Sequence, residues 1–177
     1  MPSKNQIKKQ KTGFTIIEVV LVLAIAGLIF LMVFVALPAL QRSQRDTQRR
    51  EDMARFISQL SQYEANNSGK TPGAGQTTAA NIKNAYNNTG GFIDAYLKTG
   101  GDSFVDPGGS AYTVESVTIC TSSACAQASV ANDTQGGKIR VYTNATCDGD
   151  KPLFQNGERK IAITYKLEGA GIYCGHN

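Results

Sequence analysis

The sequence is poor in the residues and motifs that carry most enzymatic chemistry. It has one histidine in 177 residues, and it contains neither a Gly-x-Ser-x-Gly motif nor a phosphate-binding loop. The paired Cys-x2-Cys motifs of structural zinc sites are also missing. These absences argue against hydrolase, nucleotide-binding and zinc-binding classes. We expect no catalytic residues, no cofactor and no metal.

Negative charge is missing from the start of the chain. Residues 1–13 contain no acidic residue but four of the 18 basic residues, and the formal net charge is +4. The remaining 14 basic residues balance the 14 acidic ones, so the basic character belongs to this leader. A neutral remainder gives little support for nucleic-acid binding.

Residues 14–38 predict a membrane-spanning helix. Positions 19–37 carry no charge, and 24 residues from Phe14 would span about 36 Å as a helix. Glu18 is the exception, because a charge in the bilayer costs about 2.5–3.5 kcal/mol. Gly27 and Pro38 are weak points for a helix.

Neither proline nor glycine interrupts residues 39–66. Apolar side chains recur there at helical spacing, and they define one stripe: Met53, Phe56, Ile57, Leu60 and Tyr63. The motif Asn-Asn-Ser-Gly at 66–69 is a stop signal. We therefore predict one helix over about 14–66, apolar all round in its first half and amphipathic in its second.

Five arginines follow the apolar segment, at positions 42, 45, 49, 50 and 55. We assign them to a solvated face with pairs inside the helix, such as Arg42 with Asp46. Contact with lipid headgroups, or with acidic groups of neighbouring subunits, is the alternative. The positive-inside rule would place this side in the cytoplasm, but the leader lysines and the cysteines favour a C-terminus outside the cell.

The C-terminal part changes to strand-like patterns. Residues 67–111 are expected to connect the helix to a sheet, with short helices near 79–87 and 91–98. Residues 112–177 alternate with period two, and the expected strands are 112–119, 138–144, 160–167 and 171–174. A long helix packed on an antiparallel sheet of three or four strands is an α+β fold.

All four cysteines lie in the C-terminal third, which suits an oxidising location outside the cytoplasm. Three pairings are possible, and we favour Cys120 with Cys125 and Cys147 with Cys174. Calcium is a weak alternative role for four acidic residues, although none has the dense ligand spacing of an EF-hand: Asp102, Asp106, Asp148 and Asp150.

The N-terminal segment "KTGFTIIEVVLVLAIAGLIF" resembles the signature of type IV pilins and pseudopilins. The family has a basic leader, Gly before a cleavage point, Phe after it and Glu as the fifth mature residue. The matching positions over residues 8–34 are Lys8, Lys9, Lys11, Gly13, Phe14 and Glu18. One departure is the proline after the helix glycine, which the family often places where Val35 stands and which here is Pro38. The segment "FVDPGGSAY" (104–112) resembles the Asp-Pro turn of many pseudopilins.

The resemblance implies cleavage between Gly13 and Phe14 by a prepilin peptidase, followed by N-methylation of Phe14. It also implies an assembly platform and a cytoplasmic ATPase that move subunits from the inner membrane and its lipid into a homopolymeric surface fibre. Glu18 would pair with the Phe14 amine of a neighbour, or within its own chain. Helical order between Gly27 and Pro38 would be lost in the fibre. A surface receptor or DNA as a further partner stays open.

The leading interpretation is a major type IV pilin, a structural subunit that serves adhesion, motility or DNA uptake. The alternative within the family is a minor pilin, or a pseudopilin of a secretion or competence system. The alternative outside it is a membrane-tethered binding module that never polymerises, which predicts no processing at Gly13.

Overall fold

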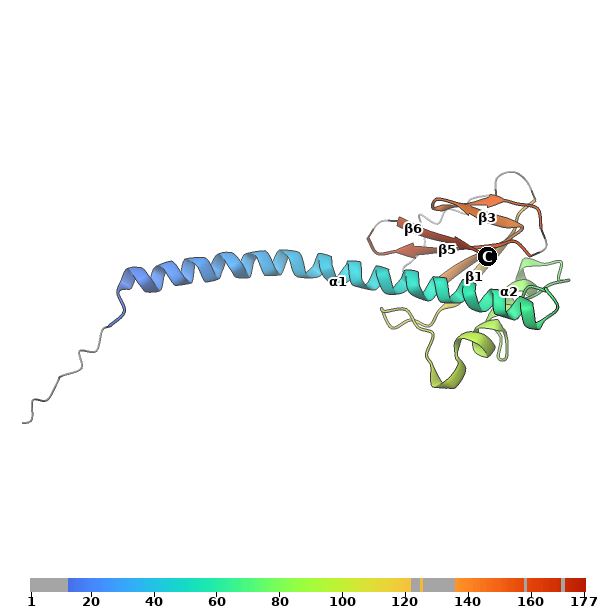
Figure 1. Cartoon of the computed structure of the whole chain (residues 1–177), viewed down its shortest axis with the longest axis horizontal. Coiled ribbons are helices and arrows are strands. Elements are labelled where there is room, and N and C mark those ends of the chain that lie inside the picture. The colour runs from blue at the N-terminus through green and yellow to red at the C-terminus, as the bar shows by residue number, and fades with distance from the viewer. Residues whose placement is uncertain (1–12, 122–124, 126–135, 158, 170) are drawn as a thin grey trace, which may run out of the picture. The chain divides into compact units, whose positions relative to one another are not determined.

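The computed structural model describes residues 13–121, 125, 136–157, 159–169 and 171–177 (Figure 1). The chain divides into two compact units, residues 1–41 and 42–177, and the second is called the head below. The hydrophobic core lies in the head. The predicted leader, residues 1–12 with Gly13, falls almost wholly outside the described residues.

Helix α1 (Ile16–Asn66) is a single helix of 51 residues, which confirms the predicted long helix. It continues through Pro38 and ends at the predicted stop signal. Its buried side chains are Arg49, Met53, Phe56 and Leu60. Ile57 and Tyr63 are partly buried against the same core. The predicted apolar stripe is therefore the surface by which α1 packs in the head.

Four strands form the main sheet of the head, in the spatial order β1-β2-β5-β6. They are β1 (Thr113–Ile119), β2 (Lys138–Thr143), β5 (Ile161–Leu167) and β6 (Gly171–His176). Strand β5 pairs antiparallel with both neighbours, whereas β1 runs parallel to β2. Parallel neighbours need a connection of a dozen or more residues, and the chain between β1 and β2 is long enough. The sheet is thus antiparallel-rich, with β1 as the departure.

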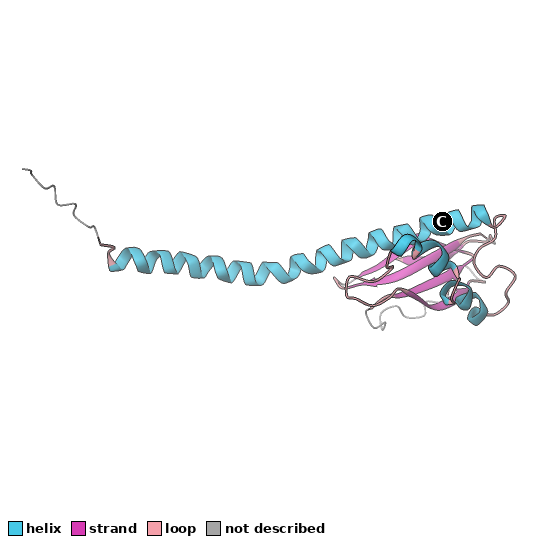
Figure 2. Ribbon diagram, turned by 90° about the horizontal axis from the view of Figure 1, so that it is seen from below, coloured by secondary structure: helices cyan, strands magenta, loops and turns pink. Residues whose placement is uncertain are grey.

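One face of this sheet packs against α1. Ile139 on β2 and Ile163 on β5 are fully buried in the same core as Phe56 of α1. Figure 2 shows the head part of α1 lying along the strands. This layer of helix on sheet is the predicted α+β arrangement, and it buries the apolar side of an alternating strand pattern.

A second, two-stranded sheet was not predicted. Strands β3 (Ala145–Asp148) and β4 (Lys151–Phe154) pair antiparallel and are joined by Gly149-Asp150. Gly149 has φ 58°, a conformation that suits glycine in a two-residue hairpin turn. The Asp-Gly-Asp sequence is therefore a turn.

The connecting region contains one regular helix, α2 (Ala79–Asn87), with the predicted bounds. Thr78 caps it, because its side chain accepts a hydrogen bond from the Asn81 N–H. The second expected helix is only a single wide π-type turn, η1 (Ile93–Leu97), which is followed by a 3-10 turn, η2 (Thr99–Gly101).

Asn87, the last residue of α2, pairs with the edge strand β1. Its Nδ2 donates to the Val114 carbonyl oxygen at 2.6 Å, and its Oδ1 accepts from the Val114 N–H at 2.8 Å. One amide side chain thus occupies both backbone groups of Val114.

Candidate functional site

Thr15 and Glu18 form a reciprocal cap at the start of α1. Glu18 Oε2 accepts hydrogen bonds from the Thr15 backbone N–H at 2.9 Å and from its hydroxyl at 2.7 Å. The Thr15 hydroxyl oxygen in turn accepts from the Glu18 N–H at 3.4 Å. This is a capping box, in which two residues three apart satisfy free N–H groups at a helix start. It explains why α1 begins at Ile16.

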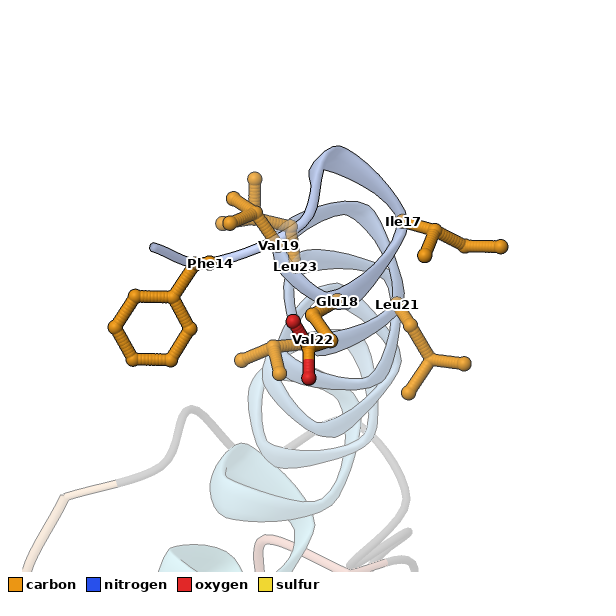
Figure 3. A pocket seen from close by; sticks show the side chains of 7 residues that line it. All are labelled: Phe14, Ile17, Glu18, Val19, Leu21, Val22 and Leu23. Atoms are coloured by element: carbon orange, nitrogen blue, oxygen red, sulfur yellow. The ribbon is translucent and has the colours of Figure 1, made fainter. Parts of the chain in front are cut away.

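The surroundings of Glu18 are apolar and open. In Figure 3 the carboxylate lies beside Val22, with Phe14 to one side of the helix and Ile17 and Leu21 to the other. The Phe14 side chain is 89% exposed. The described residues give Glu18 no ion pair, so its hydrogen bonds to Thr15 are its polar contacts there.

The first half of α1 is uncovered by the rest of its own unit. From Ile16 to Gln44, every side chain is exposed except that of Ala26, which is half-buried. By length and composition, α1 can cross a membrane. A Cβ placed on Gly27 would meet nothing within 4 Å, so no close approach within the described residues requires this glycine.

A group of buried and half-buried charged and polar side chains, the Arg49 cluster, joins α1 to two turns of the head. Its members are Asp46, Arg49, Asp106, Tyr165 and Glu168. Arg49 is only 2% exposed, and its guanidinium lies 2.6 Å from Asp106, 3.0 Å from Glu168 and 3.1 Å from Asp46. The Tyr165 hydroxyl donates to Asp106 at 2.7 Å. One guanidinium therefore bridges α1, the Asp-Pro turn and the turn after β5.

Hydrogen bonds lower the pKa of each carboxyl group in the Arg49 cluster. Burial is the largest single effect on Asp106 and would raise its pKa, but the hydrogen bonds from Arg49, Tyr165 and the Gly108 N–H, together with the charge of Arg49, outweigh it. Burial is likewise the largest single effect on Asp46, and its pKa is lowered because the backbone N–H groups of Glu168 and Gly169 and the neighbouring Arg49 together outweigh it. The pKa of Glu168 is lowered first by its hydrogen bond from Arg45. All three carboxylates are ionised at neutral pH.

The structure corrects part of the expectation that the arginines form a solvated face with pairs inside the helix. Arg42 and Arg50 are exposed, and Arg49 does pair with Asp46 inside α1. Arg49 is buried, and Asp46 pairs with it instead of with Arg42. Arg45 and Arg55 each reach an acidic residue of the head at 2.8 Å. The physical reason is that these residues lie beside the packed face of α1, where acidic side chains of two turns approach.

The aspartates considered for calcium have other roles. Asp106 belongs to the Arg49 cluster, and Asp102 forms an ion pair with Arg55 at 2.8 Å. Asp148 and Asp150 are exposed at the β3–β4 turn. Across the described ranges, no three His, Cys, Asp or Glu side chains are placed to hold a metal ion.

Both disulfides of the structure lie in the head. Cys120 is bonded to Cys125, and Cys147 is bonded to Cys174, the two pairings favoured from the sequence. The second bond joins β3 to β6 and so fastens the small sheet to the main one. Most of the residues between Cys120 and Cys125 lie outside the described ranges.

Sequence reasoning missed the Arg49 cluster, although part of its signal was present. Arg49 precedes Met53 by four residues, so it extends the buried stripe by one turn. Thr15 and Glu18 likewise match the Thr-x-x-Glu capping pattern. Asp46 lies three residues before Arg49, but the other two acidic partners, Asp106 and Glu168, are distant in sequence, and no local pattern identifies them.

Comparison with known proteins gives one match. Residues 8–34 match the family model described as the prokaryotic N-terminal methylation motif. The matched range contains Gly13, Phe14 and Glu18 and ends before Pro38. No curated protein and no solved structure matches the chain.

Proposed function

We propose, on the premise that residues 8–34 carry the type IV prepilin signature, that the chain is a structural subunit of the pilin and pseudopilin class that polymerises into a fibre. The observation that carries the proposal is the contrast in burial along α1. Apolar side chains such as Phe30 and Phe34 are 62% and 75% exposed, whereas Met53 and Phe56 are fully buried in the head. Lipid covers the exposed ones in the precursor, and neighbouring copies cover them in the fibre.

Processing at Gly13 creates the charge that the assembly needs. Cleavage by a prepilin peptidase between Gly13 and Phe14 gives Phe14 a free amine, which is then methylated. The new positive amine belongs to Phe14, four residues before Glu18. It lies at an apolar helix end, where an unpaired charge in the membrane is unfavourable in free energy. The lysine-rich leader stays in the cytoplasm, and the head with its disulfides lies outside the inner membrane and later on the cell surface.

Glu18 has two partners in this scheme. In the free subunit its carboxylate is held by Thr15 at 2.7 and 2.9 Å. In the fibre, a carboxylate already held at the helix end is available to the Phe14 amine of a neighbouring subunit. In a low dielectric a mismatched partner is expensive, so this contact sets the axial register of the subunits.

Two substitutions of Glu18 distinguish the role of its charge from its role in the helix cap. Glutamine can serve in a capping box, so Glu18→Gln keeps the cap and removes the charge, whereas Glu18→Ala removes both. We expect both variants to be cleaved at Gly13 and both to lose most of their fibre yield. The measurement combines immunoblotting of leader cleavage with quantification of sheared fibres. Normal fibre yield from Glu18→Gln would contradict the charge contact.

Mass spectrometry of the mature N-terminus tests the class itself. A methylated Phe14 as the first residue supports the proposal, and an intact Met1 in membrane fractions supports a tethered module that never polymerises. Abundance then distinguishes the roles within the class. A major pilin dominates sheared surface fibres, whereas a minor pilin or a pseudopilin is a trace component. A major pilin is our proposal, with assembly platform, ATPase and membrane lipid as partners.

A further inference from the structure

We propose that the Arg49 cluster is a latch that holds α1 to the head. From Asp46 onward, contacts with the head keep the chain helical, whereas the residues before the latch lack this support. The helix before the latch can then bend or unwind without loosening the head. This inference does not depend on the proposed function, because it rests on contacts within the head and on the residues of α1 that precede them. Its consequence for a fibre follows if the chain assembles.

The helix before the latch has only local support. Its side chains are exposed up to Gln44, and Arg49 is the first that is buried. Pro38 has no N–H, so the carbonyl of Phe34 lacks its usual partner in the helix. Gly27 costs about 1 kcal/mol relative to alanine. We therefore expect the free energy needed to unwind α1 to be lowest between Gly27 and the residues just before the latch.

The latch itself is complete as a hydrogen-bonding unit. Asp46 on α1 accepts from the backbone N–H groups of Glu168 and Gly169 at 2.9 and 2.8 Å. Asp106 accepts from Arg49, from the Tyr165 hydroxyl and from the Gly108 N–H. Because bonds run in both directions between α1 and the turns, the helix cannot shift along its axis without breaking several of them.

The charged latch can fix the orientation of α1, which the neighbouring apolar stripe cannot do. Met53, Phe56 and Leu60 give the helix most of its burial, but apolar contacts are not directional. The fork of Arg49 contacts both oxygens of Asp106, through Nε at 2.6 Å and Nη2 at 3.0 Å. Such a pair fixes both the rotation and the axial position of the helix. The register of α1 in the head is thus set at its first buried residue.

Hydrogen exchange of the full chain in detergent micelles tests the latch. In the double variant Arg49→Met, Asp106→Asn, the two fully buried charges are removed together. The half-buried carboxylates keep other partners, Asp46 the N–H groups of Glu168 and Gly169 and Glu168 the guanidinium of Arg45. We expect amides 42–52 to exchange at least about tenfold faster, while amides of β2 and β5 keep their protection within about threefold. Arg55→Met is the matched control, since it breaks an exposed pair on the same helix and leaves amides 42–52 unchanged.

Two results would overturn the latch. One is unchanged protection of amides 42–52 in the double variant. The other is an equal increase over these amides, β2 and β5, which would make the cluster a general stabiliser of the head and not a local boundary. If the double variant shows no protected β5 amides, Arg49→Lys serves instead, because it keeps one charge and loses the fork. A local increase in that variant supports the latch, and a uniform or absent one contradicts it.

Discussion

The two parts of α1 treat their side chains in opposite ways. Before Gln44 the helix exposes large apolar residues, such as Phe34 at 75%. After it, the helix buries an arginine, Arg49, at 2%. Hydrophobicity alone would reverse this order. The comparison teaches that burial in one chain depends on which partners are available. The head supplies carboxylates for Arg49, whereas the cover that we propose for the apolar part is lipid or another subunit.

Truncating an aromatic ring should affect the two parts very differently. Phe56 is fully buried, and its ring centroid lies 5.1 Å from that of Phe92 and 6.1 Å from that of Tyr86. Phe56→Ala leaves a cavity and should lower the free energy of unfolding of the head by about 3–5 kcal/mol. The measurement is denaturant unfolding of the full chain in micelles, followed by near-UV circular dichroism.

Phe34→Ala is the control for this prediction, because it removes the same ring from the exposed part of the same helix. It should leave the unfolding midpoint of the head unchanged. If both variants destabilised the head equally, the inference that the two parts of α1 contribute differently to its stability would be wrong.

Removing the disulfides should weaken the head alone. Cys147 and Cys174 are 27 residues apart in sequence, whereas Cys120 and Cys125 are five apart. The chain-entropy relation gives a loss of about 3.5 kcal/mol for the longer loop and about 2 kcal/mol for the shorter one, when both cysteines of a pair become serine. Thermal unfolding of each double variant checks the order. The helical content of residues 16–41 should not change in either variant, and a change there would count against the separation.

Restoring an N–H at position 38 should strengthen only the first part of α1. Pro38→Ala gives the Phe34 carbonyl a partner, and proline is about 3 kcal/mol less favourable than alanine inside a helix. We expect slower hydrogen exchange around residues 34–41 and an unchanged unfolding midpoint of the head. A shift of the midpoint in this variant would show that the two parts are coupled more tightly than the exposed side chains indicate.

Acid should loosen the head through the Arg49 cluster. Folding lowers the pKa values of Asp46, Asp106 and Glu168, so their stabilisation is complete above their ordinary values of 3.8 and 4.5 and is lost as the pH falls through the lowered ones. Burial raises the pKa of Asp52, so this group acts in the opposite sense.

The net expectation is a decline in the free energy of unfolding below about pH 4, after a flat or slightly rising region in which Asp52 gains its proton. Unfolding curves at stepped pH values measure it. The double variant Arg49→Met, Asp106→Asn should show a shallower decline, because the pairs that acid would break are already absent. An equally steep decline in that variant would assign the acid sensitivity to other groups.

Local patterns predicted the elements whose character repeats along the chain. The spacing of Met53, Phe56 and Leu60 identified the packed face of α1, and alternation identified β5. The direction of β1 relative to β2 was not predictable in this way, because strand alternation is the same in parallel and antiparallel pairs. Strand β4 was missed for another reason. It has four residues and contains Pro152, which counts against a strand in sequence reasoning.

The functional residues also divide into those that a local sequence pattern identifies and those that it does not. Gly13, Phe14 and Glu18 form a contiguous signature and can be recognised in a sequence. Two of the three acidic partners of Arg49, Asp106 and Glu168, come from turns more than fifty residues away, and only the folded chain brings them to Arg49.

Asn87 has a consequence for crowding. Backbone groups at the margin of a sheet can pair with a strand from another molecule, which starts aggregation. The Asn87 amide occupies both groups of Val114 on β1 and thereby imitates a neighbouring strand that cannot be extended. Asn87→Ala should therefore favour strand addition between molecules held close together. If the chain assembles into a fibre as we propose, many copies lie close together and this protection of the sheet edge matters most.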